Sequence, residues 1–216
     1  MKAILLGSIG VITETSELQR QAYNEAFKYH ALDWYWSVAN YCELLKKPGG
    51  LKRLSTFGGL SIDTNTIKQI HETKQSIFNS KIIKGLQPRK GVAECINLCK
   101  QNNIKIGLIT TTTPKMLESL SNSLAANIDF GHFDLITSKD DAINEKPDPE
   151  IFKFALSSLD IDASQAIAVE DTEANQSAAM QADILCYLFA GEYAATQYNI
   201  NAINSVENIS SLFYSG

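Results

Sequence analysis

The stretch Met1–Arg20, MKAILLGSIGVITETSELQR, decides the fold that we expect for this chain. Ala3–Leu6 is a short apolar run, and Gly7 and Gly10 follow it closely. Four apolar residues that end at a glycine-containing turn predict a buried strand that stops at a loop. When such a strand opens a series of alternating strands and helices, it usually lies in mid-sheet, and ligands bind beyond its C-terminal end. We therefore expect a binding site next to Gly7.

The following segment, residues 16–85, contains helical patterns and no convincing strand. Apolar residues recur at helical spacing within Leu18–Phe27, within Val38–Leu45 and along Thr64–Ile83. Ser16 has a side chain suited to the N-cap of the first of these helices. The segment is therefore predicted to be all-helical.

From Pro88 onward, apolar strands alternate with helical stretches. The expected strands are 104–109, 133–137, 166–169 and 184–189. Such alternation predicts a parallel sheet with right-handed crossovers. The predicted fold class is α/β, with a doubly wound parallel-sheet core formed by residues 1–15 and 86–216. An all-helical cap, residues 16–85, is inserted after the first strand.

The composition is that of an ordinary globular protein with an acidic balance. The 216 residues carry a formal net charge of −5, with 44% hydrophobic and 20% charged residues. A chain with this charge has no bulk attraction for nucleic acids or for acidic membrane surfaces. No apolar run approaches the roughly 18 residues of a membrane-spanning helix. We expect neither a nucleic acid nor a membrane as partner.

The cysteines favour a reducing compartment. Of the four, Cys95 and Cys99 alone are close in sequence, and the second ligand pair that a zinc site requires is missing. We expect reduced thiols in a cytoplasmic protein. Lys2 and the apolar residues after it resemble a secretion signal, but no small-residue cleavage motif follows and Glu14 comes too early. No coiled-coil pattern is present, so a monomer is expected.

From Gly10 onward, the opening stretch resembles the first motif of haloacid-dehalogenase-type phosphohydrolases. In that family four apolar residues precede D-x-D-G-[TV]-[LI]-x-[DE]-[TS], and Gly10–Thr15 matches from the motif's glycine onward. Gly7 stands at the position of the nucleophilic aspartate, and Ile9 at that of the general acid/base. The family's chemistry needs one carboxylate to attack phosphorus and a second carboxyl group to move the leaving group's proton. The resemblance implies that both groups are missing.

The resemblance covers essentially the whole chain and includes three later motifs. Thr110 occupies the position of the hydroxyl group that binds a phosphoryl oxygen, and Thr111 beside it is a candidate substrate contact. Lys146 matches the lysine that neutralises the nucleophile and the transferring phosphoryl group. Glu170 and Asp171 match the acidic pair that holds Mg²⁺ directly or through water. Each match alone is weak, but the joint match is specific.

The helical segment resembles the CbbY-like branch, whose members dephosphorylate sugar phosphates such as xylulose 1,5-bisphosphate. Gln19-Arg20 stands where the branch usually has His-Arg. The stretch 49–53 has Gly-Gly-Leu-Lys-Arg where the branch usually has Gly-Gly-Lys-x-Arg. The resemblance implies a phosphorylated sugar or another small anion as ligand. Its candidate contacts in this segment are Glu17, Arg20, Arg53 and Lys74.

Each candidate also has a plainer structural interpretation. The threonine run that begins at Thr110 could cap the next helix, and Lys146 could be a solvated surface lysine. Glu170 and Asp171 could be helix-capping acids, and Arg20 could serve in an ion pair on its own helix. Ser8 is disfavoured as a replacement nucleophile, because strand alternation would point its side chain away from the two aspartate positions.

We predict a degenerate phosphatase that keeps the fold but has lost the aspartate chemistry. Removing a nucleophile typically costs ~10⁴ to 10⁶ in turnover. It also removes a direct ligand of Mg²⁺, so we expect Mg²⁺ binding to be weak or absent. Lys146 can then pair with the remaining acids. The expected role is binding or regulation. The alternatives are an active Mg²⁺-dependent hydrolase of small phosphorylated sugars with a non-standard nucleophile, and a structural partner without a ligand.

Overall fold

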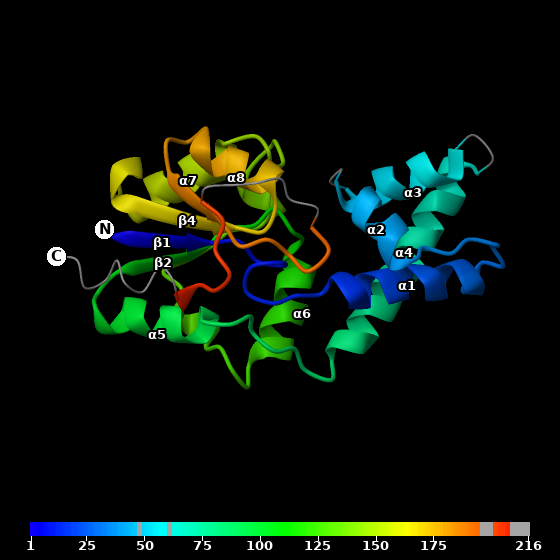
Figure 1. Cartoon of the computed structure of the whole chain (residues 1–216), viewed down its shortest axis with the longest axis horizontal. Helices are drawn as coiled ribbons and strands as arrows, with labels where there is room; N and C mark the ends of the chain where they lie inside the picture. Colours follow the sequence, from blue (N-terminus) through cyan, green and yellow to red (C-terminus); the bar gives the residue numbers. More distant parts are fainter. Residues whose placement is uncertain (47–48, 60–61, 195–200, 208–216) are drawn as a thin grey trace. The chain divides into compact units, whose positions relative to one another are not determined.

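The chain forms two compact units in a computed structural model (Figure 1). The first contains Met1–Glu14, Gly85–Gly191 and the described residues near Val206, and the second contains Thr15–Lys84 and the segment around Tyr193. The structure describes residues 1–46, 49–59, 62–194 and 201–207. From the sequence, we expect residues 86–216 to belong to the core, whereas the structure groups Tyr193 with the helical unit. Its hydroxyl group donates to Glu17 Oε2 at 2.7 Å, and this contact holds it in the helical unit.

The described residues of the first unit form a five-stranded parallel sheet in the order β3-β2-β1-β4-β5. The strands are β1 (Ala3–Leu6), β2 (Lys105–Leu108), β3 (Leu135–Ile136), β4 (Ala166–Glu170) and β5 (Leu185–Leu188). The first strand is therefore central, and the α/β fold class predicted from the sequence is confirmed. Leu6 pairs with both Leu108 and Val169, so that β1 and β2 end at the same level and β4 continues for one more residue, to Glu170.

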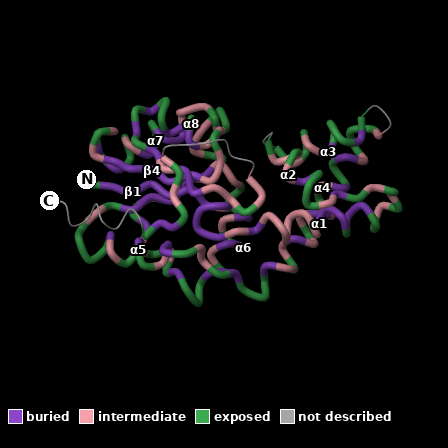
Figure 2. Tube along the Cα trace, in the orientation of Figure 1, coloured by how far each residue is buried: buried purple, intermediate pink, exposed green. Residues whose placement is uncertain are grey.

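Helices cover both faces of this sheet. Figure 1 shows α7 (Glu150–Leu159) and α8 (Glu173–Met180) on one side and α5 (Val92–Gln101) on the other. A further helix, α6, spans Pro114–Leu124. Every residue of the central strands β1 and β4 is buried (Figure 2), because a parallel sheet that is covered on both faces has apolar side chains pointing both ways.

The second unit consists of helices in its described part. They are α1 (Ser16–Tyr29), α2 (Val38–Leu45), α3 (Gly50–Gly58) and α4 (Thr64–Ile82). A cluster of buried aromatic side chains forms its core: Tyr23, Phe27, Trp36 and Tyr41. The ring centroids of Tyr23 and Trp36 are 4.5 Å apart, which is within the range of favourable aromatic pairs.

The start of α1 differs from the expectation. Thr15 holds the N-cap position, and Ser16, the expected cap, is the first helical residue. The Thr15 side chain makes no capping hydrogen bond, although its residue is almost fully buried. The side-chain type of Ser16 therefore indicated the helix start only to within one residue. None of the described helices is both long enough and apolar enough to cross a membrane.

Candidate functional site

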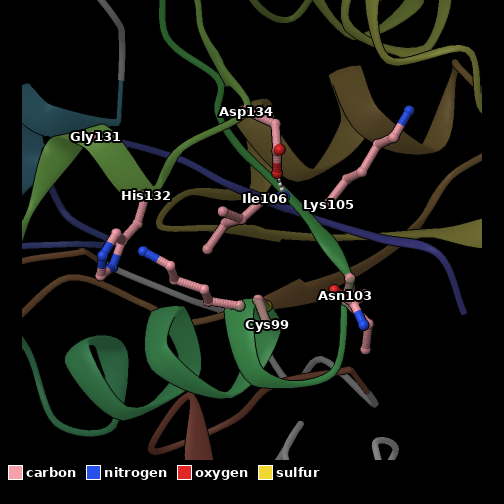
Figure 3. Close-up of a pocket in the computed structure, with 9 residues that line it drawn as sticks. Cys99, Asn103, Lys105, Ile106, Gly131, His132 and Asp134 are labelled. Carbon is pink, nitrogen blue, oxygen red and sulfur yellow. Dashed lines mark hydrogen bonds between the residues drawn. The ribbon is translucent and has the colours of Figure 1, made fainter.

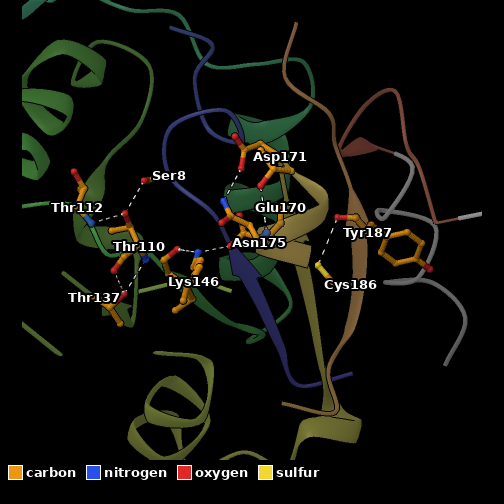
Figure 4. A network of polar contacts seen from close by, with 12 residues as sticks. Ser8, Thr110, Thr112, Thr137, Lys146, Glu170, Asp171, Asn175, Cys186 and Tyr187 are labelled. Atoms are coloured by element: carbon orange, nitrogen blue, oxygen red, sulfur yellow. Dashed lines mark hydrogen bonds and ion pairs between the residues drawn. The ribbon is translucent and has the colours of Figure 1, made fainter. Parts of the chain in front are cut away.

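The C-terminal ends of β1, β2 and β4 bring the predicted core residues together. Gly7 follows β1, and its backbone N–H donates to Val169 O at 2.9 Å. Thr110 follows β2 closely, and Glu170 is the last residue of β4. Figure 4 shows Thr110, Lys146, Glu170 and Asp171 as neighbours in one network of polar contacts. The parallel register explains this convergence, because these strands end at the same edge of the sheet.

Glu170 occupies the space beside Gly7. A Cβ atom built on Gly7 would lie 2.5 Å from Glu170 Oε2 and 2.9 Å from Val11 Cγ2. Glu170 itself is only 1% exposed. Position 7 therefore has no room for a side chain while Glu170 keeps this conformation. Ile9, at the second aspartate position, is half-buried and offers no group that can carry a proton.

Lys146 forms a buried ion pair with Glu170. Its Nζ contacts Glu170 Oε1, and it also donates to Ile109 O at 2.8 Å. The two side chains are 7% and 1% exposed. Lys146 is therefore not a solvated surface lysine. A buried carboxylate requires such a partner, because transfer of an unpaired charge out of water is very costly.

Thr110 is fixed by hydrogen bonds to its backbone and its hydroxyl group. Its N–H donates to Thr137 Oγ1 at 2.8 Å, and that hydroxyl group donates to Thr110 O at 2.9 Å. Thr110 Oγ1 accepts from Ser8 Oγ at 2.9 Å. Thr111 follows it and is half-buried. The helix-capping role falls to Thr113, whose side chain accepts the Met116 N–H.

Ser8 differs from the sequence expectation in its orientation. The alternation of side chains applies within a strand, but β1 ends at Leu6. Ser8 lies in the turn beyond it, and its buried hydroxyl group is directed to Thr110. This hydrogen bond connects the loop after β1 to the loop after β2.

Asp171 follows Glu170 in the chain, and the pKa of its carboxyl group is raised. Withdrawal from solvent raises the pKa of its carboxyl group to about 7, and the neighbouring Glu170 carboxylate adds to the effect. A hydrogen bond from Asn175 Nδ2 to Asp171 Oδ1, at 2.9 Å, acts in the opposite direction. Thr172 holds the N-cap position of α8, and its side chain accepts the Asn175 N–H. The two acids are therefore not the N-cap of this helix.

The residues present offer few ligands for a metal ion. Mg²⁺ prefers an octahedral set of oxygen ligands that includes carboxylates. Within the described parts of the chain, no group of three or more His, Cys, Asp or Glu side chains is placed to hold a metal. Glu170 and Asp171 remain as two neighbouring acids, and Glu170 is already bound by Lys146.

Gly10 is required by the close approach of Asp171. Its φ of +88° lies in the region that favours glycine, and a Cβ atom there would lie 2.6 Å from Asp171 Cβ. Gly10→Ala should reduce the free energy of unfolding by about 3 kcal/mol, through backbone strain and overpacking together. Chemical denaturation measures this loss. Gly85→Ala is the matched control, because Gly85 has a φ of +96°, close to that of Gly10, but its added Cβ would meet only Ser123 O, at an ordinary contact distance of 3.8 Å. Equal losses in the two variants would contradict the role of Asp171.

Arg89 was not identified from the sequence, although it links three parts of the core. Its guanidinium group donates to the carbonyl oxygens of Gly10, Phe189 and Ala190, the last two at 2.8 Å. Its Cζ lies 3.3 Å from the centroid of the Phe189 ring. Burial lowers the pKa of Arg89, and the nearby acids Glu14 and Asp171 oppose this shift. Arg89 thus holds the loop after β1 to the end of β5.

In the helical unit, Glu17 and Arg20 bind each other. Arg20 Nε and Nη2 donate to the two carboxylate oxygens of Glu17 at 2.8 and 2.6 Å. Arg20 Nη1 donates to Trp36 O at 2.8 Å. The hydrogen bonds from Arg20 are the main cause that lowers the pKa of Glu17 to about 2. These contacts agree with the ion-pair interpretation of Arg20.

Arg53 and Lys74 are the other two predicted contacts of the helical unit. Arg53 Nε donates to Leu44 O at 2.9 Å, and its guanidinium group lies 5.8 Å from the centroid of the Tyr41 ring. Lys74 is only 4% exposed, and its Nζ lies 4.8 Å from the centroid of the Tyr23 ring. Both cations therefore lie against the aromatic core of this unit.

A separate cavity of about 340 Å³ lies near the start of β2 (Figure 3). Its lining includes Cys99, Asn103, His132 and Asp134. Asp134 Oδ2 accepts the Ile106 N–H at 2.7 Å, which ties its carboxylate to the strand. Because the cavity lies at the N-terminal end of β2, it is distinct from the site that follows the C-terminal strand ends.

A parallel sheet whose strand ends gather a threonine, a lysine and paired acids is the arrangement that the haloacid-dehalogenase-type class of α/β proteins implies for this chain. The family model described as haloacid dehalogenase-like hydrolase matches residues 10–189, and the chain belongs to this family. The match begins after Gly7 and Ile9. The family resemblance identified from the motifs is thereby confirmed.

Similar proteins support the CbbY-like branch. The chain is 33% identical over 202 residues to protein CbbY of Cereibacter sphaeroides, covering 89% of this chain and 86% of that protein. The crystal structure of CbbY from Rhodobacter sphaeroides in complex with phosphate superposes with a TM-score of 0.84 at 30% identity, covering 97% and 96% of the two chains. A mutant of the same protein in complex with xylulose-(1,5)bisphosphate gives a TM-score of 0.82 at 30% identity, covering 95% and 94%.

Proposed function

We propose that this protein has lost phosphatase turnover and acts by binding a phosphorylated sugar or another small anion. One observation carries the proposal. The place where the family's nucleophile would begin is Gly7, and the carboxylate of Glu170 fills the space beside it. The role that follows is binding or regulation within a hydrolase family.

Glu170, Ser8 and Ile9 are not suited to replace the missing chemistry. Glu170 is 1% exposed and bound by Lys146, so its oxygens are not available to attack a phosphorus atom. The Ser8 hydroxyl group donates to Thr110, which cannot serve as a general base that activates it. Ile9 has no proton to give to a leaving group.

We also propose that Mg²⁺ binding is weak or absent. A direct carboxylate ligand is missing at position 7, and the described residues provide no third ligand side chain in its place. Lys146 supplies the positive charge that Glu170 requires. The acid pair is therefore compatible with a site that folds without metal.

Two sets of groups support a phosphorylated ligand. In the core, Thr110, Thr111 and Lys146 remain at the strand ends. In the helical unit, Arg53 provides half-buried positive charge, and the buried Lys74 supplies a second positive charge when it is protonated. The similar CbbY structures contain phosphate and xylulose bisphosphate, and we extend this ligand class to the present chain.

We propose a cytoplasmic monomer as the working state. The four cysteines are free thiols in the structure. Burial raises the pKa of Cys186, which keeps that thiol protonated and unreactive. These properties fit a reducing compartment.

The unmodified chain should release no phosphate above the blank from a panel of sugar phosphates, with or without Mg²⁺. A phosphorylated sugar that binds the native state should still raise the melting temperature. A phosphate-release assay and a thermal-shift screen on the same preparation measure both. Lys146→Met, purified identically, is the control, because contaminating activity would be the same in both samples. Mg²⁺-stimulated release that disappears in this variant would show that the protein is an active enzyme.

A further inference from the structure

Lys74 is a buried cation whose hydrogen-bond partners are neutral. Its Nζ donates to the side-chain oxygens of Gln19 and Gln75, the latter at 2.8 Å. It also lies near the rings of Tyr23 and Phe78, at 4.8 and 5.1 Å from their centroids. Amide oxygens and ring faces stabilise an ammonium group much less than a carboxylate does.

The acids on the facing helix are already paired. Glu17 of α1 is bound by Arg20 and by the Tyr193 hydroxyl group. Glu25 of α1 pairs with Lys81 at 2.7 Å. Among the described residues, neither acid is a partner of Lys74, so that the ammonium group has no counter-charge in this cluster.

The charged and titratable groups that face Lys74 either repel its charge or are neutral. Arg53 of α3 and burial together lower the pKa of Lys74 to about 7, with burial as the larger cause. Burial also lowers the pKa of His71 to about 4, so this ring is neutral at pH 7. Burial raises the pKa of the Tyr23 phenol, which is therefore neutral as well. His71 Nδ1 is buried and has no hydrogen-bond partner in the described structure.

We propose that an anionic ligand binds the helical unit at Lys74 together with one proton. This inference rests on the proposed binding function and specifies its regulation. An anion next to Lys74 supplies the missing counter-charge and stabilises the ammonium form over the neutral amine. Above pH 7 the free protein holds Lys74 largely as the amine, so binding has to include proton uptake. Affinity should then fall about tenfold per pH unit between pH 7 and 9.

Isothermal titration of the whole chain with xylulose 1,5-bisphosphate tests this inference. Titrations at pH 8 in two buffers of different ionisation enthalpy give the number of protons taken up, and the phosphate groups do not titrate there. The expected uptake is close to one proton. Lys74→Arg keeps a positive charge that does not titrate near neutrality, so this variant should bind without proton uptake. Lys81→Met, on the same helix, should keep the uptake of the unmodified chain.

The outcomes separate the two proposals. Binding by the unmodified chain without proton uptake would overturn the inference and leave the binding function standing. Proton uptake that persists in Lys74→Arg would overturn the assignment to Lys74. An absence of binding at every pH from 5.5 to 9 would overturn the proposed function and the inference with it.

Discussion

Gly7→Asp combined with Ile9→Asp should release phosphate from a sugar phosphate at a rate at least about a hundredfold above the background rate, in the presence of Mg²⁺. Loss of a nucleophile typically costs ~10⁴ to 10⁶ in turnover, so partial recovery is a large effect. Thr110, Lys146 and Glu170 already meet at the strand ends. The two aspartates would return the missing groups to that edge of the sheet.

The phosphate release that the double variant recovers should depend strictly on Mg²⁺, because Glu170 fills the space beside position 7 and has to be displaced. The new side chain needs volume that Glu170 now occupies, since a Cβ there would lie 2.5 Å from Glu170 Oε2. A metal ion gives the displaced carboxylate a new partner and offsets the repulsion between the acids. We therefore expect Mg²⁺ to raise the melting temperature of the double variant but not that of the unmodified chain.

The matched control for this experiment is Gly7→Asn combined with Ile9→Asp. Asparagine has nearly the size of aspartate but cannot attack phosphorus, so the control should release phosphate at the background rate. Kinetics at several Mg²⁺ concentrations compare the variants. A folded double aspartate variant that binds Mg²⁺ yet remains inactive would contradict the prediction, and would show that the loops around the site have lost their catalytic geometry.

Lys146→Met should reduce the free energy of unfolding by about 3–5 kcal/mol. The change removes the partner of a carboxylate that is 1% exposed and leaves Glu170 unpaired beside Asp171. Urea denaturation at pH 7 measures the loss. An unpaired buried charge is among the few single changes with so large an effect.

Two further variants separate charge from packing in this experiment. Lys146→Met combined with Glu170→Gln removes both charges and should recover more than half of the lost stability. Lys46→Met breaks an exposed pair with Glu43, whose side chains are 50% and 69% exposed, and should cost less than about 1 kcal/mol. If Lys146→Met lost as little free energy of unfolding as Lys46→Met, the burial of Glu170 would not depend on the charge of Lys146.

Much of the fold could be predicted from short-range patterns. Periodic apolar residues located α4 (Thr64–Ile82), and the apolar run at Ala3–Leu6 located the central strand. Once parallel strands were expected, the residues after them had to meet at one edge, which is why Thr110 and Glu170 could be placed near each other. The match to the family motifs identified Thr110 and Glu170 as the site residues among those that follow the strands.

The contacts that complete the site could not be predicted, because they join distant parts of the chain. Arg89 and Gly10 are 79 residues apart, and Tyr193 and Glu17 are 176 residues apart. Thr137 supports Thr110 from 27 residues away. No local pattern marks these partners, since their roles depend on how loops from different strands pack. The position of Glu170 beside Gly7 likewise depends on the conformation of one side chain.

The carboxylate of Glu170 beside Gly7 has a consequence for the history of the protein. A single reversion at position 7 would first displace a buried, paired acid and place like charges together. Such an intermediate would be less stable than its parent and still lack the second aspartate. Under the loss of turnover that we propose, a return to aspartate at position 7 therefore begins with a loss of stability.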